Sequence, residues 1–330
     1  MLKIKFLPKM LCMTATLIAG AMTTVMPATA VAAYPEKPIT IVVPFSAGGA
    51  ADTLGRLLAE KIAKKVKQPV VVENKPGAGT LIASQHVANA KPDGYTLLLA
   101  ASSLGTIPSI NKDARYDPVK SFVPITQVAS VVHVISVNPE VPVNNVKELI
   151  EYLKKNKGKV SYASLGTGSS TQLEAELFKN MAQVDMQEIP YKGSAPALTD
   201  LISGRVQVMF DAWASTGPYQ KAGKVKVLAV TTDKPSPSIP DMPTISEAVP
   251  GFSAMPWLGL VAPKGTPAEV SDVIYQAVQE SVQQDDVKEK FKTLGLDVIA
   301  SDPVTFGKFI EKDVKTWGEV IRKAHITMNP

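Results

Sequence analysis

Short apolar runs alternate with longer segments of helical periodicity from residue 34 to residue 325. The runs are rich in β-branched residues and predict strands at residues 39–43, 70–72, 95–99, 160–162, 186–189, 206–210 and 225–230. Apolar positions spaced along one helix face predict helices at residues 50–66, 81–88, 146–154, 171–181 and 195–202, and a further helical group at 267–325. This alternation is typical of α/β proteins, in which crossover helices join parallel strands.

Two apolar stretches, residues 123–137 and 257–261, lack a helical pattern and are predicted to cross between two lobes. A chain of about 300 residues commonly divides into two domains. With both crossings, the first lobe contains residues 34–125 and 255–330, and the second contains residues 126–254. The prediction is therefore a two-lobed α/β protein with a hinge of crossing strands and a ligand cleft between the lobes.

Residues 1–33 have the layout of a secretory signal peptide. Three lysines precede an apolar stretch at residues 10–22, and small residues follow up to Ala33. A membrane-spanning helix needs about 20 apolar residues, and this stretch is shorter. We expect cleavage near Ala32 or Ala33, which would also remove Cys12, the single cysteine of the sequence.

Charge and motif content argue against several classes of protein. Loss of the three lysines of the signal lowers the formal net charge from +5 to +2, and the basic clusters lack interleaved aromatic residues, so no nucleic-acid partner is predicted. After Gly166 and Gly168 the third position is Thr171, so the dinucleotide fingerprint is absent. No Gly-x-Ser-x-Gly elbow occurs. The histidines, which are too far apart in sequence to suggest a metal site, are His86, His133 and His325.

A glycine-rich turn follows the first predicted strand and leads into the first helix. Glycine lets the backbone approach a ligand closely, and the unpaired amides of a helix's first turn attract anions. The turn would therefore suit a carboxylate or a phosphate. Its ligand-binding candidates are Phe45, Ser46, Ala47, Gly48, Gly49 and Asp52.

The predicted strand at residues 160–162 is followed by a second turn of this kind, richer in hydroxyl groups. Ligands of open α/β folds bind where strand-to-helix loops meet. Either turn alone also fits simple chain reversal, and the pairing of the two is the stronger signal. The candidates in the second turn are Ser164, Gly166, Thr167, Gly168, Ser169, Thr171 and Gln172.

Other candidates follow later strands. Tyr191 and Gly193 are expected beside the cleft, and Ser102 follows the predicted strand at residues 95–99. Asp211 would accept a hydrogen bond from a ligand hydroxyl or amino group, or else cap a helix at residues 212–216. Trp213 is a candidate for stacking on an aromatic acid, although a packing role is the more common one for a tryptophan.

Three segments carry a resemblance to a known family: VPFSAGGAADTLGR at residues 43–56, SLGTGSSTQL at 164–173, and YKGSAPALTDLISGRVQVMFD at 191–211. They resemble the receptors of tripartite tricarboxylate transporters, often called Bug proteins, over essentially the whole mature chain. The resemblance implies a type II-like periplasmic binding protein fold. It also implies a carboxylate ligand, aromatic and dicarboxylic acids included, held partly through ordered water by residues 45–49, Asp52 and residues 164–172.

The predicted function is that of a periplasmic receptor which binds a small organic carboxylate and passes it to the permease subunits of a transporter. No catalytic residue, metal or cofactor is expected, and the chain is expected to be a monomer. Two alternatives stay open at this point, because the same pocket would serve a sensor subunit of a signalling partner, and a secreted hydrolase with a Ser–His pair fits less well. Trp213 lies in a stretch, residues 212–214, that does not match the family pattern.

Overall fold

The computed structural model describes residues 2, 34–48, 50–191 and 193–327. The predicted signal peptide lies outside the described residues apart from Leu2, and so does the candidate Gly49. None of the described helices has both the length and the apolar content that a membrane crossing requires. The chain from Tyr34 onward forms one compact unit, which contains two β-sheets.

The first sheet has six strands in the order β11-β4-β10-β3-β1-β2. β1 pairs in parallel with β2 and β3, whereas β10 and β11 run antiparallel to their neighbours. The strands are β1 (Ile39–Val43), β2 (Val70–Asn74), β3 (Thr96–Ala101), β4 (Phe122–Val131), β10 (Trp257–Pro263) and β11 (Leu296–Val298). The β-branched sequence of β1 is almost wholly buried, as expected for an inner strand covered on both faces.

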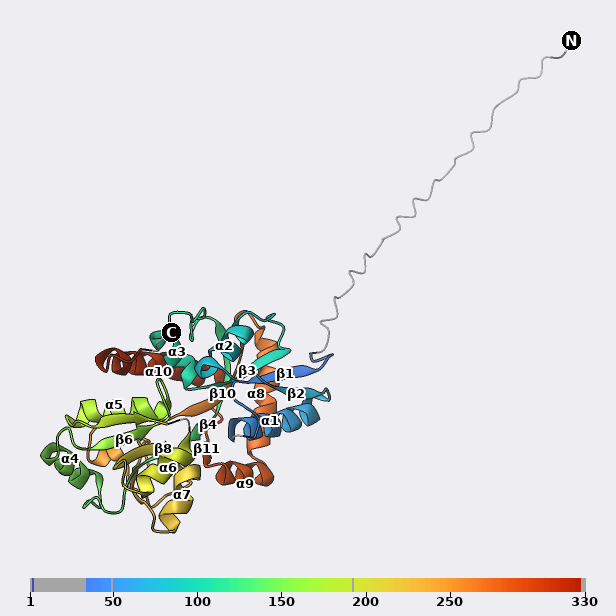
Figure 1. The fold of residues 1–330 in the computed structure, drawn as a ribbon. Helices are drawn as coiled ribbons and strands as arrows, with labels where there is room; N and C mark the ends of the chain where they lie inside the picture. Colours follow the sequence, from blue (N-terminus) through green and yellow to red (C-terminus); the bar gives the residue numbers. More distant parts are fainter. Residues whose placement is uncertain (1, 3–33, 49, 192, 328–330) are drawn as a thin grey trace. The chain divides into compact units, whose positions relative to one another are not determined.

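The second sheet has five strands in the order β7-β6-β8-β5-β9. β6 pairs in parallel with β7 and β8, and β5 runs antiparallel to β8 and β9. The strands are β5 (His133–Val137), β6 (Ser161–Ser164), β7 (Gln187–Pro190), β8 (Val208–Ala212) and β9 (Lys226–Val230). Figure 1 shows that the middle of the chain, in green and yellow, builds this sheet and its helices, while segments from both ends build the other sheet.

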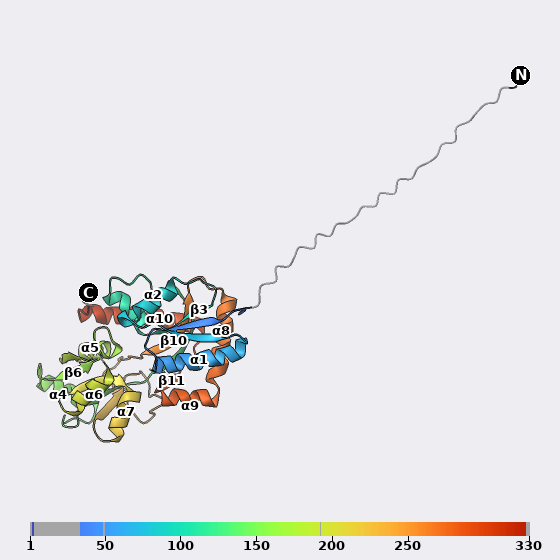
Figure 2. The same ribbon diagram turned by 45° about the vertical axis from the view of Figure 1, so that its right-hand side comes forward.

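The helices fall into the same two groups, which a second view also shows (Figure 2). Helices α1 and α8 contact each other beside the six-stranded sheet, and α5 and α6 contact β8 of the five-stranded sheet. The helices are α1 (Ala50–Val66), α2 (Leu81–Ala88), α3 (Ser103–Ile110), α4 (Val146–Lys155), α5 (Ser170–Ala182), α6 (Ser194–Ile202), α7 (Trp213–Lys221), α8 (Ala268–Val282), α9 (Asp285–Thr293) and α10 (Pro303–Lys323). Two short 3₁₀ helices, η1 (Ala78–Thr80) and η2 (Ile245–Glu247), complete the set.

Local sequence explains where several helices begin. The side chain of Asn145 accepts a hydrogen bond from the Glu148 amide and caps α4, and Asp302 does the same for Thr305 at the start of α10. Pro303 occupies the first turn of α10, where no backbone donor is needed. Each cap satisfies an amide that the helix itself leaves without a partner.

The chain passes between the two sheets at two points. β4 and β5 are separated by Val132 alone, so one extended stretch contributes a strand to each sheet. On the return, Ala254 donates to the Thr231 carbonyl beyond β9, and Val131 donates to the Pro256 carbonyl just before β10. The first passage lies in the predicted crossing at residues 123–137, whereas the second ends just before residues 257–261, which lie wholly in β10 of the six-stranded sheet. The lobe limits at residues 125 and 254 stay a prediction.

The core is apolar on both sides of these crossings. One cluster of buried side chains surrounds Phe178, Phe210 and Phe252, and it continues through α10 by way of Trp317 and Ile321. Another cluster fills the space between α1, α8 and the six-stranded sheet, with Leu58 and Ile274 fully buried. Fully burying one such side chain stabilises a protein by about 1.5–3 kcal/mol, so these clusters hold the strand ends and their loops in fixed positions.

Candidate functional site

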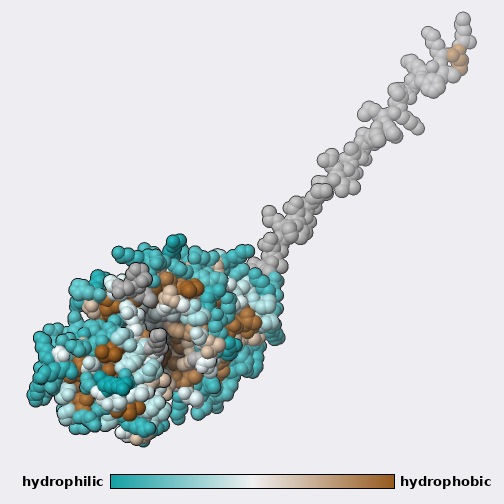
Figure 3. Space-filling view, viewed as in Figure 1, coloured by the Kyte–Doolittle hydropathy of each residue, from teal (hydrophilic) through white to brown (hydrophobic). Residues whose placement is uncertain are grey.

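A cavity of about 950 Å³ is lined by loops from both sheets, and we call it the cleft. Small-molecule sites commonly have volumes of about 300–1,000 Å³. On the side of the six-stranded sheet the lining of the cleft includes residues 44–46, 50–51, 76–77 and 79–80. On the other side it includes residues 165, 167–170 and 193–194. Figure 3 shows a hollow on this face of the molecule.

The first loop, residues 44–48, is held by the side chain of Asp52, which is 3% exposed. The Gly48 amide donates to Asp52 Oδ2 at 2.9 Å, and Asn74 Nδ2 donates to Asp52 Oδ1 at 2.9 Å. Arg56 Nε donates to Oδ2 at 3.0 Å. The hydrogen bonds from Arg56, Gly48 and Asn74 lower the pKa of Asp52 to about 2. Asp52 is therefore an ionised group that fixes the loop from behind, and it does not line the cleft.

The second loop, residues 164–169, is held by Gln172 in the same way. The Gly168 amide donates to Gln172 Oε1 at 2.7 Å, and Gln172 Nε2 donates to Glu188 Oε2 at 2.8 Å. Glu188 on β7 also accepts from the Ser164 hydroxyl at 2.5 Å. In both loops a glycine amide is thus bonded to the side chain four residues further along, in the first turn of the helix.

These bonds change which amides face a ligand. The sequence suggests the amides of Gly48 and Gly168 as anion donors, but both already donate to Asp52 and Gln172. Ser169 caps α5 by accepting from the Gln172 amide, and the amides of the first helical turn have no carbonyl one turn back. Ser170, the first residue of α5, lines the cleft, so its amide is a donor available to an anion.

The structure brings eight of the predicted ligand-binding residues to the cleft and leaves nine described ones outside its lining. The eight are Phe45, Ser46, Ser102, Thr167, Gly168, Ser169, Gly193 and Asp211. The nine are Ala47, Gly48, Asp52, Ser164, Gly166, Thr171, Gln172, Tyr191 and Trp213. Ser164, Asp52 and Gln172 belong to the hydrogen bonds that hold the two loops, which is a supporting role.

Three of the predicted residues have other surroundings than the sequence suggests. The Tyr191 hydroxyl donates to Asp200 at 2.9 Å, and burial together with this carboxylate raises the pKa of Tyr191 to about 12. Trp213 packs against the buried cluster that includes Val134, and it does not line the cleft. Asp211 lies within β8 and accepts from the Ser194 hydroxyl at 2.8 Å, while the residue at the cap position of α7 is Ala212.

Sequence reasoning missed several lining groups. The hydroxyls of Thr80 and Ser103 lie 2.8 Å apart beside the cleft, and both residues belong to elements, η1 and α3, that the sequence does not predict. His133 and Ser194 also line the cleft. The signal available for His133 is a single histidine within the apolar stretch 123–137, and nothing in the sequence relates it to the cleft.

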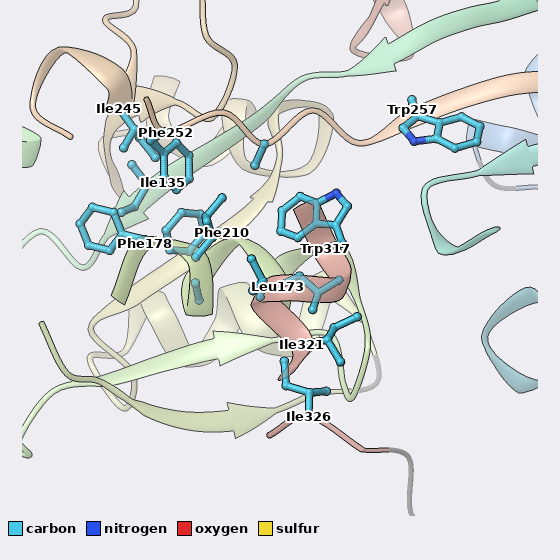
Figure 4. Close-up of a cluster of buried hydrophobic side chains, with 14 of the residues drawn as sticks. Ile135, Leu173, Phe178, Phe210, Ile245, Phe252, Trp257, Trp317, Ile321 and Ile326 are labelled. Atoms are coloured by element: carbon cyan, nitrogen blue, oxygen red, sulfur yellow. The ribbon is translucent and has the colours of Figure 1, made fainter. Parts of the chain in front are cut away.

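Two tryptophans form part of the wall. Trp257 and Trp317 both donate to the carboxylate of Asp313, at 3.1 Å and 2.9 Å. Figure 4 shows Trp317 on α10 near Leu173 of α5, which lines the cleft as well. Burial raises the pKa of Asp313 to about 6, although the two indole donors act in the opposite direction. Trp257 also packs edge-on against Phe306 and is 1% exposed, which is a packing role.

The described residues contain no group of three or more histidine, cysteine, aspartate or glutamate side chains arranged to hold a metal ion. Their lining of the cleft has hydroxyls, backbone amides and apolar side chains, and its only ionisable side chains are those of His133 and Asp211. The cleft is suited to binding an organic molecule that has a polar end and an apolar body.

Two α/β sheets joined by crossing strands, with loops of both around one cleft, define the class of periplasmic binding proteins. The chain belongs to the tripartite tricarboxylate transporter family of receptors, TctC, whose family model matches residues 54–326. It is a solute-binding receptor of the Bug type and not an enzyme.

Three solved structures illustrate the similarity. The periplasmic binding protein BugD is 39% identical, with a TM-score of 0.73, over 90% of this chain and 100% of that one. Rpa4515 of R. palustris, solved with adipate, is 33% identical, with a TM-score of 0.76, over 89% and 99% of the two chains. MatC of Rhodopseudomonas palustris, solved with bound malate, is 31% identical, with a TM-score of 0.73, over 87% and 100%.

Proposed function

We propose that this chain captures a small organic carboxylate in the cleft and delivers it to the membrane subunits of a tripartite transporter. It acts in the periplasm as a monomer, after the predicted signal peptide has been removed. The two lobes close on the ligand through the crossing strands, as periplasmic binding proteins do. The ligand leaves chemically unchanged.

One observation supports this proposal most: a loop from each sheet borders the same cavity, and the second loop ends in the first turn of α5. The N-terminus of a helix carries about half a positive elementary charge, and its amides point at the bound anion. The hydroxyls of Ser46 and Ser169 line the cavity as further donors. A carboxylate is an acceptor for several donors at once, which matches this set.

The rest of the lining favours an organic anion over an inorganic one. Apolar side chains from both sheets border the cleft, among them Leu173 and Leu258. No lysine or arginine belongs to the lining formed by the described residues. The anion would therefore be held by backbone and hydroxyl dipoles, while the apolar wall takes the carbon skeleton. Relatives solved with adipate and with malate support the same ligand class.

A thermal-shift screen of carboxylates tests the proposal. A ligand at 100 times its dissociation constant stabilises the folded state by about 2.7 kcal/mol, which raises Tm. Adipate, malate and aromatic acids are compared with their uncharged amides and with inorganic phosphate. The proposal predicts a shift for at least one carboxylate and none for its amide.

A matched pair of variants separates the helix terminus from general damage. Ser170→Pro removes one amide donor at the first position of α5, where proline is well tolerated, and the extended backbone of Ser169 is compatible with a following proline. Ser170→Ala keeps the amide and removes only the hydroxyl. We expect Ser170→Pro to lose the ligand-induced shift at unchanged intrinsic Tm. If a carboxylate still raises the Tm of Ser170→Pro, the amide at the N-terminus of α5 does not hold the ligand.

A further inference from the structure

Three ionisable side chains meet at the cleft wall on the side of the five-stranded sheet, and two of them line the cleft. They are His133 on β5, Glu174 on α5 and Asp211 on β8. Their exposures are 6%, 0% and 1%, so all three are buried. Burying ionisable groups is costly unless they are paired, and such groups are often part of a site. The helix-terminus anchor described above does not use them.

His133 connects this group to the cleft. Its Nδ1 lies 3.0 Å from the Glu174 carboxylate, so that side of the ring is turned towards α5. His133 also lines the cleft. Among the described residues no hydrogen bond to Nε2 is found, and Nε2 is not one of the buried polar atoms that lack a partner. The ring edge that carries Nε2 therefore borders the cleft, as does Asp211 of the same cluster.

Electrostatics favour the charged form of the ring. Burial by itself lowers the pKa of His133, but the charge and hydrogen bond of Glu174 and the charge of Asp211 outweigh it, and the net direction is upward. Burial raises the pKa of Glu174 and of Asp211. An imidazolium is the protonation state in which both ring nitrogens donate hydrogen bonds.

Neighbouring elements add few charges. Lys226 on β9 pairs with Val137 at the far end of β5, and its ammonium group donates to the Val141 carbonyl. Lys221 lies in the last turn of α7. On α10, Asp313 holds the indole of Trp317 at the cleft wall. The side chains of Lys226, Lys221 and Asp313 do not line the cleft, whereas that of Asp211 does. His133 is therefore the only basic side chain among the described lining residues.

The position of His133 suits a ligand with two ends. Glu174 lies four residues after Ser170, which is about 6 Å along the axis of α5. His133 contacts Glu174, so it borders the cleft roughly one helical turn beyond the helix terminus. A chain of a few carbon atoms spans that distance, with Leu173 and other apolar side chains beside it.

We propose that the cleft-facing edge of His133 donates a hydrogen bond to a second anionic group of the ligand, and that Glu174 positions the ring. The first carboxylate lies at the N-terminus of α5, so His133 would distinguish ligands with two carboxylates from those with one. This inference rests on the proposed function and names the residue that makes this selection. Binding the second carboxylate stabilises the imidazolium, and by reciprocity protonation of His133 strengthens binding. Affinity therefore falls as pH rises through the pKa of His133.

Isothermal titration calorimetry of the mature chain tests this with adipate and hexanoate, which differ only in the second carboxylate. A hydrogen bond to a charged group is strong, so we expect adipate to bind about tenfold or more tightly on the acid side of the His133 pKa than on its alkaline side, in a series of titrations over the whole pH range in which the protein stays folded. Hexanoate should change much less over this range. An effect of Asp313 that acts on any carboxylate cancels in the ratio of the two affinities. Ionisation of Asp211, which lines the cleft beside His133, would repel only the second carboxylate, and the His133→Gln variant separates that effect from titration of the ring.

Two variants test the roles of the residues. Glu174→Gln removes the charge that favours the imidazolium, so the midpoint of the adipate pH profile should move to lower pH while binding at acid pH persists. His133→Gln keeps a polar side chain without a titrating ring, and the ratio of adipate to hexanoate affinity should become independent of pH. A merely structural role for either residue would change Tm and leave the pH profile in place.

The outcomes separate this inference from the proposed function. If neither acid nor any other carboxylate binds, the proposed function fails. If adipate and hexanoate bind with the same pH dependence, the His133 site is refuted and the carboxylate receptor stands. If a variant does not fold, the wild-type ratio of affinities decides, because a flat ratio is incompatible with a titrating donor at the second carboxylate.

Discussion

The buried carboxyl group of Asp313 makes the stability of the protein depend on pH in an unusual direction. Its side chain is buried and accepts from two indoles, yet its pKa is raised from 3.8 to about 6 because burial disfavours the charge. The folded state therefore binds more protons than the unfolded state between these two values. Stability from this group is complete below about pH 3.8 and decreases as pH rises towards about 6.

The magnitude follows from the two pKa values. Raising the pKa from 3.8 to about 6 makes the free energy of unfolding about 3 kcal/mol lower at high pH than at low pH. About 2 kcal/mol of this decrease occurs between pH 4 and pH 7.5. Asp313→Asn cannot ionise and retains one acceptor oxygen for two indole donors, so it should be about 1–3 kcal/mol less stable than wild type at acid pH, where Asp313 is protonated. We expect the stability advantage of wild type over the variant to decrease by about 2 kcal/mol between pH 4 and pH 7.5.

Urea unfolding of wild type and Asp313→Asn, monitored by tryptophan fluorescence across this pH range, measures the difference in their free energies of unfolding. Comparing the two proteins removes the contributions of Glu174, Asp211 and other titrating groups that both retain. A difference that stays constant with pH would show that Asp313 does not titrate in this range. The interpretation of Asp313 as an acid held in an apolar wall would then be wrong.

Three further predictions concern the loops and the cleft. Asp52 has a pKa lowered to about 2, so its hydrogen bonds stabilise the fold above about pH 4 and are lost as pH falls through about 2; acid unfolding of Asp52→Asn should lack this step. Gly168 has φ of +76°, and a Cβ there would lie within 2.2 Å of Ile110 Cδ1. Gly168→Ala should therefore cost about 1–2 kcal/mol by urea unfolding and weaken carboxylate binding in calorimetry, and adding Ile110→Ala should restore part of the binding but not the backbone strain. Trp213→Ala should leave the affinity for aromatic acids unchanged, and a loss there would mean that the closed protein brings this ring to the ligand.

The regular elements follow closely from the sequence where local and tertiary preferences agree. Residues 39–43, 50–66 and 81–88 form β1, α1 and α2 with the predicted limits, because β-branched or amphipathic residues there also face a core. Helix α3 is absent from the prediction, and α7 appears there only as the alternative helix at residues 212–216. Each contains a glycine and a proline, which disfavour a helix in isolation, so tertiary packing determines these elements. The three-residue strand β11 exists only through its pairing with β4.

The candidate site was predictable as two loops but not as a set of contacts. Both loops border the cleft, since they follow parallel strands and precede helices. The bonds from Gly48 to Asp52 and from Gly168 to Gln172 occupy the amides that seemed available, and side-chain geometry of this kind is not encoded in residue spacing. The contact of His133 with Glu174 joins residues 41 positions apart, which a single sequence does not reveal.

A crystal structure of the mature protein with adipate examines most directly whether loops from both sheets hold one ligand. We expect one carboxylate between Ser46 and the first turn of α5, within hydrogen-bond reach of the Ser170 amide directly or through one water. A carboxylate that contacts only one of the two loops, or that binds in the separate cavity of about 310 Å³ lined by α5 and α10, would contradict the proposed mode of binding.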